Sequence, residues 1–281
     1  MVANRTGKRE REQRERRAYL THNRPLFFAH RGGAALRPEN TIEAFTYGLS
    51  FGADALELDI QTTREGEIVV IHDATVDRTT NGAGPVGSFT LDELRRLDAG
   101  YHFTTDGGQT YPFRGQGCAV PTLRAVFEQF PQTRINIDLK ETTAEREEKL
   151  WRLIQEYAAE DRVLVASGDV HAGILRFRRL TEGRVATSAS APEIRNFVLA
   201  CLFHTTTMLR PAYDALQVPD IWKGIRITSP RTINAAHHFG LDLHVWTIDD
   251  EATMRLLLDW GVDGLMSDRP DVLARVLSQT K

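Results

Sequence analysis

The sequence predicts an α/β fold in which eight parallel strands close into a (β/α)8 TIM barrel, with a small insertion subdomain after the second strand. Three observations predict this fold. From Leu26 onward, short β-rich runs alternate with longer helical patterns, which is typical of a parallel sheet with crossover helices. The alternation gives eight strands, the number that closes such a barrel. The length of 281 residues suits one barrel domain of about 250 residues.

The expected strands are short, apolar and rich in β-branched residues. They are Leu26–His30, Ala55–Ile60, Arg134–Leu139, Val163–Ser167, Arg184–Ser188, Ala215–Val218, Leu243–Thr247 and Gly264–Ser267. The helical stretches that alternate with them are Asn40–Phe51, Leu123–Phe130, Thr143–Ala159, Ala172–Leu180, Pro192–Met208, Thr232–Phe239 and Asp250–Trp260. Asn40, with Glu43 three residues later, is expected to cap the first helix. Gly240 and Gly261 stand just before the last two strands, where helix C-caps are expected.

The connection after the second strand is too long for an ordinary βα loop. Residues 61–120 begin with a strand-like run, Glu67–His72, and contain a short helical pattern, Leu91–Leu97, among Gly- and Thr-rich stretches. Because a loop of this length without structure is uncommon in a compact domain, we expect a small insertion on the carboxyl face of the barrel. The barrel domain is thus expected over residues 25–281, after a basic N-terminal helix or arm at residues 1–24.

Charge and composition argue against several classes of protein. The chain has 35 Lys and Arg against 38 Asp and Glu, a net charge of −3, unlike a strongly basic nucleic-acid binder. Cys118 and Cys201 cannot build a disulfide framework. The longest apolar run, Phe197–Phe203, is far shorter than the ~18 residues that span a bilayer. No export signal is recognisable before Arg17, so we expect a cytoplasmic protein, whose basic arm is either a solvated helix or a weak tether to a membrane surface.

Polar side chains stand at the ends of three predicted strands, where the core of a barrel is otherwise apolar. They are His30 and Arg31, Glu57 and Asp59, and Asp138 and Lys140. Residues two apart on a strand point to the same side, so Glu57 and Asp59 reach the barrel mouth together. Burying like charges is costly unless a cation joins them. Because carboxylate oxygens favour hard ions, the expected cofactor is a divalent cation, Mg²⁺ or Ca²⁺ rather than Zn²⁺.

Two histidines accompany these groups, His30 on the first strand and His72 after the strand-like run of the insertion. Taken singly, each is explained as a structural histidine with satisfied hydrogen bonds. Beside a carboxylate-bound cation they gain a joint role, because histidine transfers protons near neutral pH. Arg31 and Lys140 can hold a phosphate. A metal, an acid, a base and a phosphate clamp are the parts that cleave a phosphodiester.

An ordered set of motifs contains these residues. It runs through His30–Arg31–Gly32, Pro38–Glu39–Asn40–Thr41, Glu57–Leu58–Asp59, His72–Asp73, Asp77–Arg78–Thr79–Thr80, Asn136–Ile137–Asp138–Leu139–Lys140 and Val245–Trp246–Thr247. In this order and combination, the chain resembles the glycerophosphodiester phosphodiesterase family from about Leu26 to its C-terminus. Many members of that family carry Glu where this chain has Asp138, and the shorter side chain is expected to alter metal affinity and preference.

The resemblance implies metal-dependent hydrolysis of a glycerophosphodiester to an alcohol and glycerol 3-phosphate. The roles that it implies are general acid–base catalysis by His30 and His72, metal binding by Glu57, Asp59 and Asp138, phosphate binding by Arg31 and Lys140, and pocket lining by Trp246. Which histidine is the acid stays open, as does the choice between water and the substrate's own 2-hydroxyl as the nucleophile. The expected partner is the substrate, with no nucleic acid.

Two other functions are kept as alternatives. The nearest is a lysophospholipase D, because the stretches Asn196–Met208 and Asp214–Pro219 resemble that branch of the family. The apolar stretch Asn196–Met208 either packs on the barrel or borders an acyl groove that includes Phe197 and Phe203. The other is a catalytically inactive barrel that binds lipid or a partner protein. The intact set of histidines, acids and bases argues against this second alternative, since a binding role does not need all of them.

Overall fold

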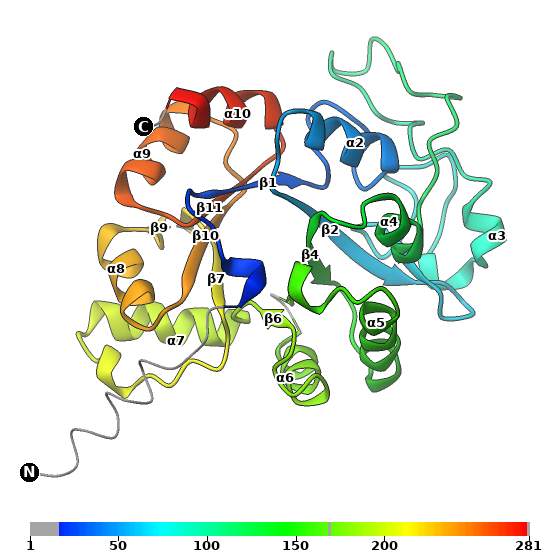
Figure 1. Cartoon of the computed structure of the whole chain (residues 1–281). Helices are drawn as coiled ribbons and strands as arrows, with labels where there is room; N and C mark the ends of the chain where they lie inside the picture. Colours follow the sequence, from blue (N-terminus) through cyan, green and yellow to red (C-terminus); the bar gives the residue numbers. More distant parts are fainter. Residues whose placement is uncertain (1–16, 168–169, 280–281) are drawn as a thin grey trace, which may run out of the picture.

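The computed structural model describes residues 17–167 and 170–279, and this part of the chain forms a barrel of eight parallel strands (Figure 1). The strands are β1 (Leu26–His30), β2 (Ala55–Thr62), β4 (Arg134–Leu139), β5 (Val163–Ala166), β6 (Ala186–Thr187), β7 (Ala215–Pro219), β10 (Asp242–Trp246) and β11 (Gly264–Ser267). They follow the order β6-β5-β4-β2-β1-β11-β10-β7, and a parallel bridge between Ser188 and Ala215 joins the two ends of this order. The predicted fold class is therefore confirmed.

Helices alternate with the strands and surround the barrel (Figure 1). They are α2 (Ile42–Ser50), α4 (Leu123–Gln129), α5 (Ala144–Glu156), α6 (His171–Leu180), α7 (Ala191–Leu202), α8 (Pro230–His238), α9 (Glu251–Trp260) and α10 (Pro270–Gln279). Outward-facing side chains of the strands, such as Leu56 and Leu58 of β2, are buried beneath these helices in a large apolar cluster. Helix α10 lies beyond the helices predicted from the sequence, although Pro270 is a common first residue of a helix.

Helix α2 is capped by Thr41 and not by Asn40. The Thr41 side chain accepts a hydrogen bond from the Ala44 N–H at 3.1 Å. Asn40 has a positive φ of 59° and turns its side chain toward β2, where its Nδ2 donates to Asp59 Oδ2 at 2.9 Å. The cap predicted at Asn40 is therefore wrong, because a contact to the neighbouring strand draws the amide away from the helix.

Several elements are shorter than predicted, most clearly one strand and one helix. The strand predicted at Arg184–Ser188 is reduced to the two residues of β6. The helix predicted at Pro192–Met208 ends at Leu202, and a separate 3-10 turn (Thr206–Met208) follows it. Gly261, with a φ of 86°, ends α9 as predicted, because its left-handed backbone allows the chain to leave the helix.

Besides the 3-10 turns, four short elements of the described residues lie outside the barrel and its helices. They are β3 (Ile68–Val70), α3 (Leu91–Leu94), β8 (Ile221–Trp222) and β9 (Ile225–Arg226). The first two belong to the long connection after β2, where β3 pairs antiparallel with the end of β2. Val69, Val76 and Leu94 are buried in an apolar cluster made by this connection alone. The connection is therefore a packed insertion with its own small core. The other two strands form a hairpin after β7 that the sequence pattern does not predict.

A short 3-10 helix, η1 (Ala18–Leu20), closes the amino end of the barrel and is seen in blue at the centre of Figure 1. Tyr19 and Leu20 are buried against inward-facing side chains of the strands. Arg134 at the start of β4 donates a hydrogen bond to the carbonyl oxygen of Tyr19 at 2.9 Å. Residues 1–16 of the arm predicted for residues 1–24 lie outside the described residues. The remaining part of the arm contains η1, which closes the amino end of the barrel.

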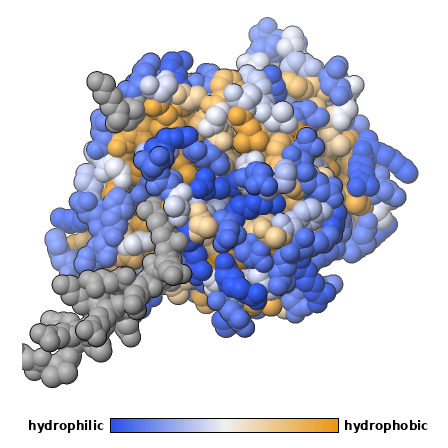
Figure 2. Space-filling model, in the orientation of Figure 1, coloured by the Kyte–Doolittle hydropathy of each residue, from blue (hydrophilic) through white to orange (hydrophobic). Residues whose placement is uncertain are grey.

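The surface seen from this side is mostly hydrophilic in its lower and right-hand parts, and hydrophobic residues show chiefly in its upper half (Figure 2). Large hydrophobic side chains that are exposed include Phe203 and Met208 after α7 and Trp222 and Ile225 of the hairpin. Within the described residues, no helix is both long enough and apolar enough to cross a membrane.

Candidate active site

All eight side chains predicted for the site line one cavity at the carboxyl end of the barrel strands. They are His30, Arg31, Glu57, Asp59, His72, Asp138, Lys140 and Trp246. The cavity has a volume of about 280 Å³, and Asn136 and Gln217 also line it. The fold brings these residues together because each stands on or just beyond a barrel strand or, for His72, shortly after β3, which pairs with β2.

Basic side chains lie between the carboxylates of the cavity. Asp59 of β2 is the register partner of Asp138 of β4. Lys140 Nζ lies 2.9 Å from Asp59 Oδ1 and 2.6 Å from Asp138 Oδ2. Arg31 Nε lies 3.1 Å from Asp59 Oδ2. Burial disfavours a charge on Asp59, but its neighbours, of which Lys140 and Arg31 have the largest effects, outweigh burial and lower the pKa of Asp59. Asp59 is therefore ionised at neutral pH.

Glu57 is the carboxyl group with the least compensating charge. It is buried and lies near Asp59, and both conditions raise its pKa, with burial the larger cause. Its Oε2 accepts a hydrogen bond from the backbone N–H of Arg31 at 3.1 Å. A divalent cation beside Glu57 would favour its ionised form. Three carboxyl groups in one cavity, one of which has a pKa raised by burial and by the neighbouring Asp59, therefore suit a hard divalent cation.

Each histidine of the cavity is held by a carboxylate. His30 Nδ1 lies 2.6 Å from Asp268 Oδ1, and His30 Nε2 lies 3.7 Å from Glu57 Oε2. His72 Nδ1 lies 2.6 Å from Asp73 Oδ1. Burial lowers the pKa of His30, but Glu57 and Asp268 outweigh this and raise it. A carboxylate on Nδ1 orients each ring and leaves Nε2 as the nitrogen for proton transfer.

A chain of ion pairs connects Arg31, which follows β1, to Asp73, which holds His72. It passes through residues to which the sequence pattern assigns no role. Arg31 Nη1 lies 3.1 Å from Glu39 Oε1. Arg78 Nη1 lies 2.7 Å from Glu39 Oε2, and Arg78 Nε lies 2.7 Å from Asp73 Oδ2. Arg31 is thereby linked to the carboxylate that holds His72. Both Asp73 and Arg78 stand in motifs of the sequence, which is the signal that could have found them.

The floor and the rim of the cavity differ in character. At the floor, the buried Gln217 donates from Nε2 to Asn136 Oδ1 at 2.7 Å. At the rim, Trp246 is the last residue of β10, where it pairs with Pro219 of β7, and is 39% exposed. The cavity therefore offers amide groups inside and one aromatic face toward solvent.

The apolar helix α7 packs on the barrel and does not border the cavity. Phe197 is buried and contacts Phe239, with ring centroids 6.4 Å apart. A crossover helix runs antiparallel to the two parallel strands that it joins, here β6 and β7, so the end of α7, with the exposed Phe203, lies toward the amino end of the barrel. Phe197 therefore packs on the barrel as one of the two interpretations expects, whereas Phe203 is exposed, and neither side chain lines the cavity.

Comparisons with known proteins agree with this arrangement. The model of a family described as the glycerophosphoryl diester phosphodiesterase family matches residues 30–272. A glycerophosphodiester phosphodiesterase from Caldanaerobacter subterraneus subsp. tengcongensis is 34% identical over 90% of this chain and 97% of that protein. A lysophospholipase D from Mus musculus is 26% identical over 95% of this chain and 89% of that protein.

A solved structure of a glycerophosphodiester phosphodiesterase from Agrobacterium tumefaciens is 27% identical, with a TM-score of 0.72 over 89% of this chain and 99% of that chain. The similarity thus extends over almost the whole barrel, including the strands and loops that line the cavity. These matches identify an enzyme, a phosphoric diester hydrolase. The chain belongs to the glycerophosphoryl diester phosphodiesterase family.

Proposed function

We propose that the protein hydrolyses glycerophosphodiesters to an alcohol and glycerol 3-phosphate by metal-assisted acid–base catalysis. The observation that carries the proposal is the single cavity that contains three carboxyl groups, two carboxylate-held histidines and two cationic side chains. Relatives at 34% and 33% identity over 90% of this chain carry the name glycerophosphodiester phosphodiesterase. Chemistry and relatedness therefore support the same reaction.

Glu57, Asp59 and Asp138 are the residues that would hold the cation. When bound, a divalent cation polarises a phosphate oxygen and lowers the pKa of the attacking hydroxyl. Arg31 and Lys140, which now pair with Asp59, would bind the remaining phosphate oxygens. The carboxylates and the basic groups now pair with each other. In the complex, the carboxylates would also contact the cation, and the basic groups would also contact the phosphate.

His30 and His72 would move the two protons of the reaction. One imidazole takes the proton from the attacking hydroxyl, and the other gives a proton to the oxygen of the leaving alcohol as its P–O bond breaks. Asp268 and Asp73 keep the rings in place through Nδ1. The nucleophile is water or the substrate's own 2-hydroxyl. The second route first gives a cyclic phosphate, which water then opens to glycerol 3-phosphate, and the same pair of histidines would move the protons of both steps.

Glycerophosphocholine is expected to be cleaved with a higher kcat/KM than lysophosphatidylcholine, by about tenfold, which corresponds to about 1.4 kcal/mol. The reason is that an acyl chain must leave water, and most of the residues that line the cavity are polar or charged. A substrate panel with released choline as the readout checks this. A higher kcat/KM for the acylated substrate would favour the lysophospholipase D alternative. If neither substrate is cleaved, the alternative of a catalytically inactive barrel is favoured.

Asp138→Glu is expected to lower the cation concentration needed for half-maximal activity by about tenfold, with little change in Tm. The longer side chain restores the reach that is usual in the family, at a position that is partly solvent-accessible. Activation curves with Mg²⁺ and with Ca²⁺ measure the effect. Asp138→Asn, which keeps the size but removes the charge, is the matched control and should raise the required concentration; equal curves for all three proteins would remove Asp138 from the metal site.

A further inference from the structure

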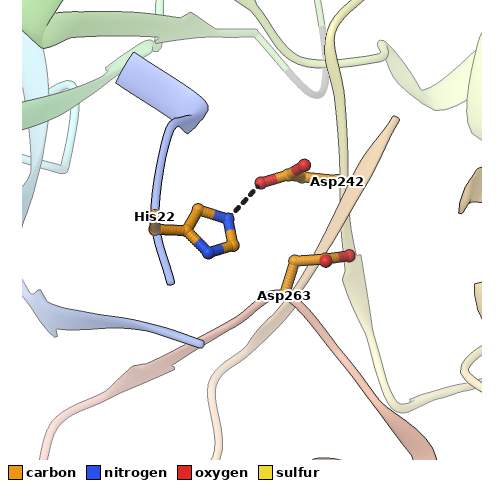
Figure 3. Close-up of side chains that lie close together, drawn as sticks. All are labelled: His22, Asp242 and Asp263. Carbon is orange, nitrogen blue, oxygen red and sulfur yellow. Dashed lines mark hydrogen bonds and ion pairs between the residues drawn. The ribbon is translucent and has the colours of Figure 1, made fainter. Parts of the chain in front are cut away.

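We propose that the protein binds a zinc ion at the amino end of the barrel, between His22, Asp242 and Asp263 (Figure 3). His22 lies in the segment between η1 and β1, Asp242 is the first residue of β10, and Asp263 directly precedes β11. One potential ligand atom from each of these residues lies within 4.8 Å of the others. The three side chains, brought together from distant parts of the sequence, form a cluster that we call the basal cluster.

The basal cluster is separate from the catalytic cavity. Asp242 begins β10, whereas Trp246, at the other end of the same strand, lines the cavity. Four residues of an extended strand span about 13 Å. The proposal therefore concerns a second site and does not rest on the proposed function.

The carboxylates of the basal cluster are largely shielded from water. The side chain of Asp242 is 6% exposed and that of Asp263 is 16% exposed. Two neighbouring buried carboxylates are costly unless positive charge joins them. The ion-pair partners that face them include imidazoles: His22 Nε2 lies 2.7 Å from Asp242 Oδ2, and His237 Nε2 lies 2.8 Å from Asp263 Oδ2. Imidazole is itself a metal ligand when neutral.

A buried histidine supplies a second, independent observation. His244 is fully buried, and its Nδ1 lies 3.3 Å from Gln217 Nε2. Its Nε2 has no hydrogen-bond partner among the described residues and lies 3.7 Å from Asp242 Oδ2. A buried polar atom without a partner is costly and calls for an explanation. Water bound to an ion in the basal cluster would satisfy it.

The donor set selects zinc over the ions that suit the cavity. Zn²⁺ is bound by imidazole nitrogen and carboxylate oxygen, commonly with three protein ligands and a water. His22, Asp242 and Asp263 supply this set, and His237 orients the carboxylate of Asp263. The catalytic cavity offers carboxylates to a cation and favours Mg²⁺ or Ca²⁺. The two sites can therefore be loaded separately.

Zinc in the basal cluster would hold the segment after η1 against the amino ends of β10 and β11. His22 follows η1, whose Tyr19 and Leu20 fill the amino end of the barrel. A ligand that binds only the folded chain stabilises it by mass action. We therefore expect zinc to raise Tm without a requirement for activity.

The test is a zinc titration of the full, metal-stripped chain in excess Mg²⁺, followed by calorimetry and by thermal unfolding. One equivalent of Zn²⁺ is expected to bind and to raise Tm. His22→Ala and Asp263→Asn are expected to weaken zinc binding by about 10–100-fold. In the wild-type chain, Asp263 Oδ2 accepts a hydrogen bond from the Leu243 N–H at 2.8 Å. Asp263→Asn keeps a side-chain oxygen that can accept the same hydrogen bond. The Asp263→Asn variant therefore keeps the contact to β10 and loses only the charge of the carboxylate.

Asp54→Asn is the matched control. Asp54 precedes β2, and its Oδ2 accepts a hydrogen bond from the Phe27 N–H of β1 at 2.9 Å. Asp263 makes the same kind of contact with the Leu243 N–H of β10. Its other oxygen pairs with Arg24 at 2.8 Å instead of with an imidazole. Zinc affinity should be unchanged in this variant. Three results would overturn the proposal: no zinc bound by the wild-type chain, equal loss in Asp54→Asn, or loss in Asp138→Asn instead of His22→Ala, which would put the zinc in the cavity.

Discussion

Replacing His30 or His72 by alanine is expected to lower kcat for glycerophosphocholine by about 10²–10⁴-fold while Tm changes little. Both rings line the cavity, and each is oriented by a carboxylate through Nδ1. Proton transfer is lost with the imidazole, whereas the apolar layers that stabilise the barrel lie elsewhere. Steady-state kinetics beside thermal unfolding of each variant give the two numbers that are needed.

His238→Ala is the control for this experiment. His238 is an exposed histidine of α8, outside the cavity, and its replacement should change neither kcat nor Tm. A parallel fall of activity and Tm in both cavity variants would mean that His30 and His72 are structural. Retained activity in either variant would remove that residue from the proton-transfer pair.

Much of the site can be predicted because its chemistry follows local patterns. Glu57 and Asp59 stand two residues apart on a strand, and their shared direction follows from the geometry of any β-strand. Asp138 and Lys140 repeat the spacing, and parallel strands bring both pairs to the same end of the barrel. The structure places these side chains around one cavity, as their positions on the strands suggest.

Contacts between distant segments could not be predicted in this way. Asp268, which holds His30, lies 238 residues away in the sequence and becomes its neighbour because the barrel closes between β1 and β11. The same limit explains Asn40. Its local sequence is that of a helix cap, but a hydrogen bond to Asp59 on the adjacent strand determines its conformation. The sequence pattern describes neighbours along the chain, and closure of the barrel decides neighbours in space.

Removing divalent ions with a chelator is expected to abolish glycerophosphodiester hydrolysis, and added Mg²⁺ or Ca²⁺ is expected to restore it better than Zn²⁺. The physical reason lies in the balance of charge around Glu57. Asp59 is compensated by Lys140 and Arg31, whereas burial and the charge on Asp59 raise the pKa of Glu57. A cation favours the ionised form of Glu57 and would supply the positive charge that the cavity lacks.

The measurement is choline release from glycerophosphocholine by metal-stripped protein, with single ions added back at rising concentration. Thermal unfolding in the same samples separates loss of the catalytic ion from loss of fold, because Mg²⁺ should restore turnover whatever happens at the basal cluster. Full turnover in stripped protein with excess chelator would contradict metal-assisted catalysis. In that case Arg31 and Lys140 would have to stabilise the phosphate charge alone, and the three acids around them would serve to hold those two cations in place.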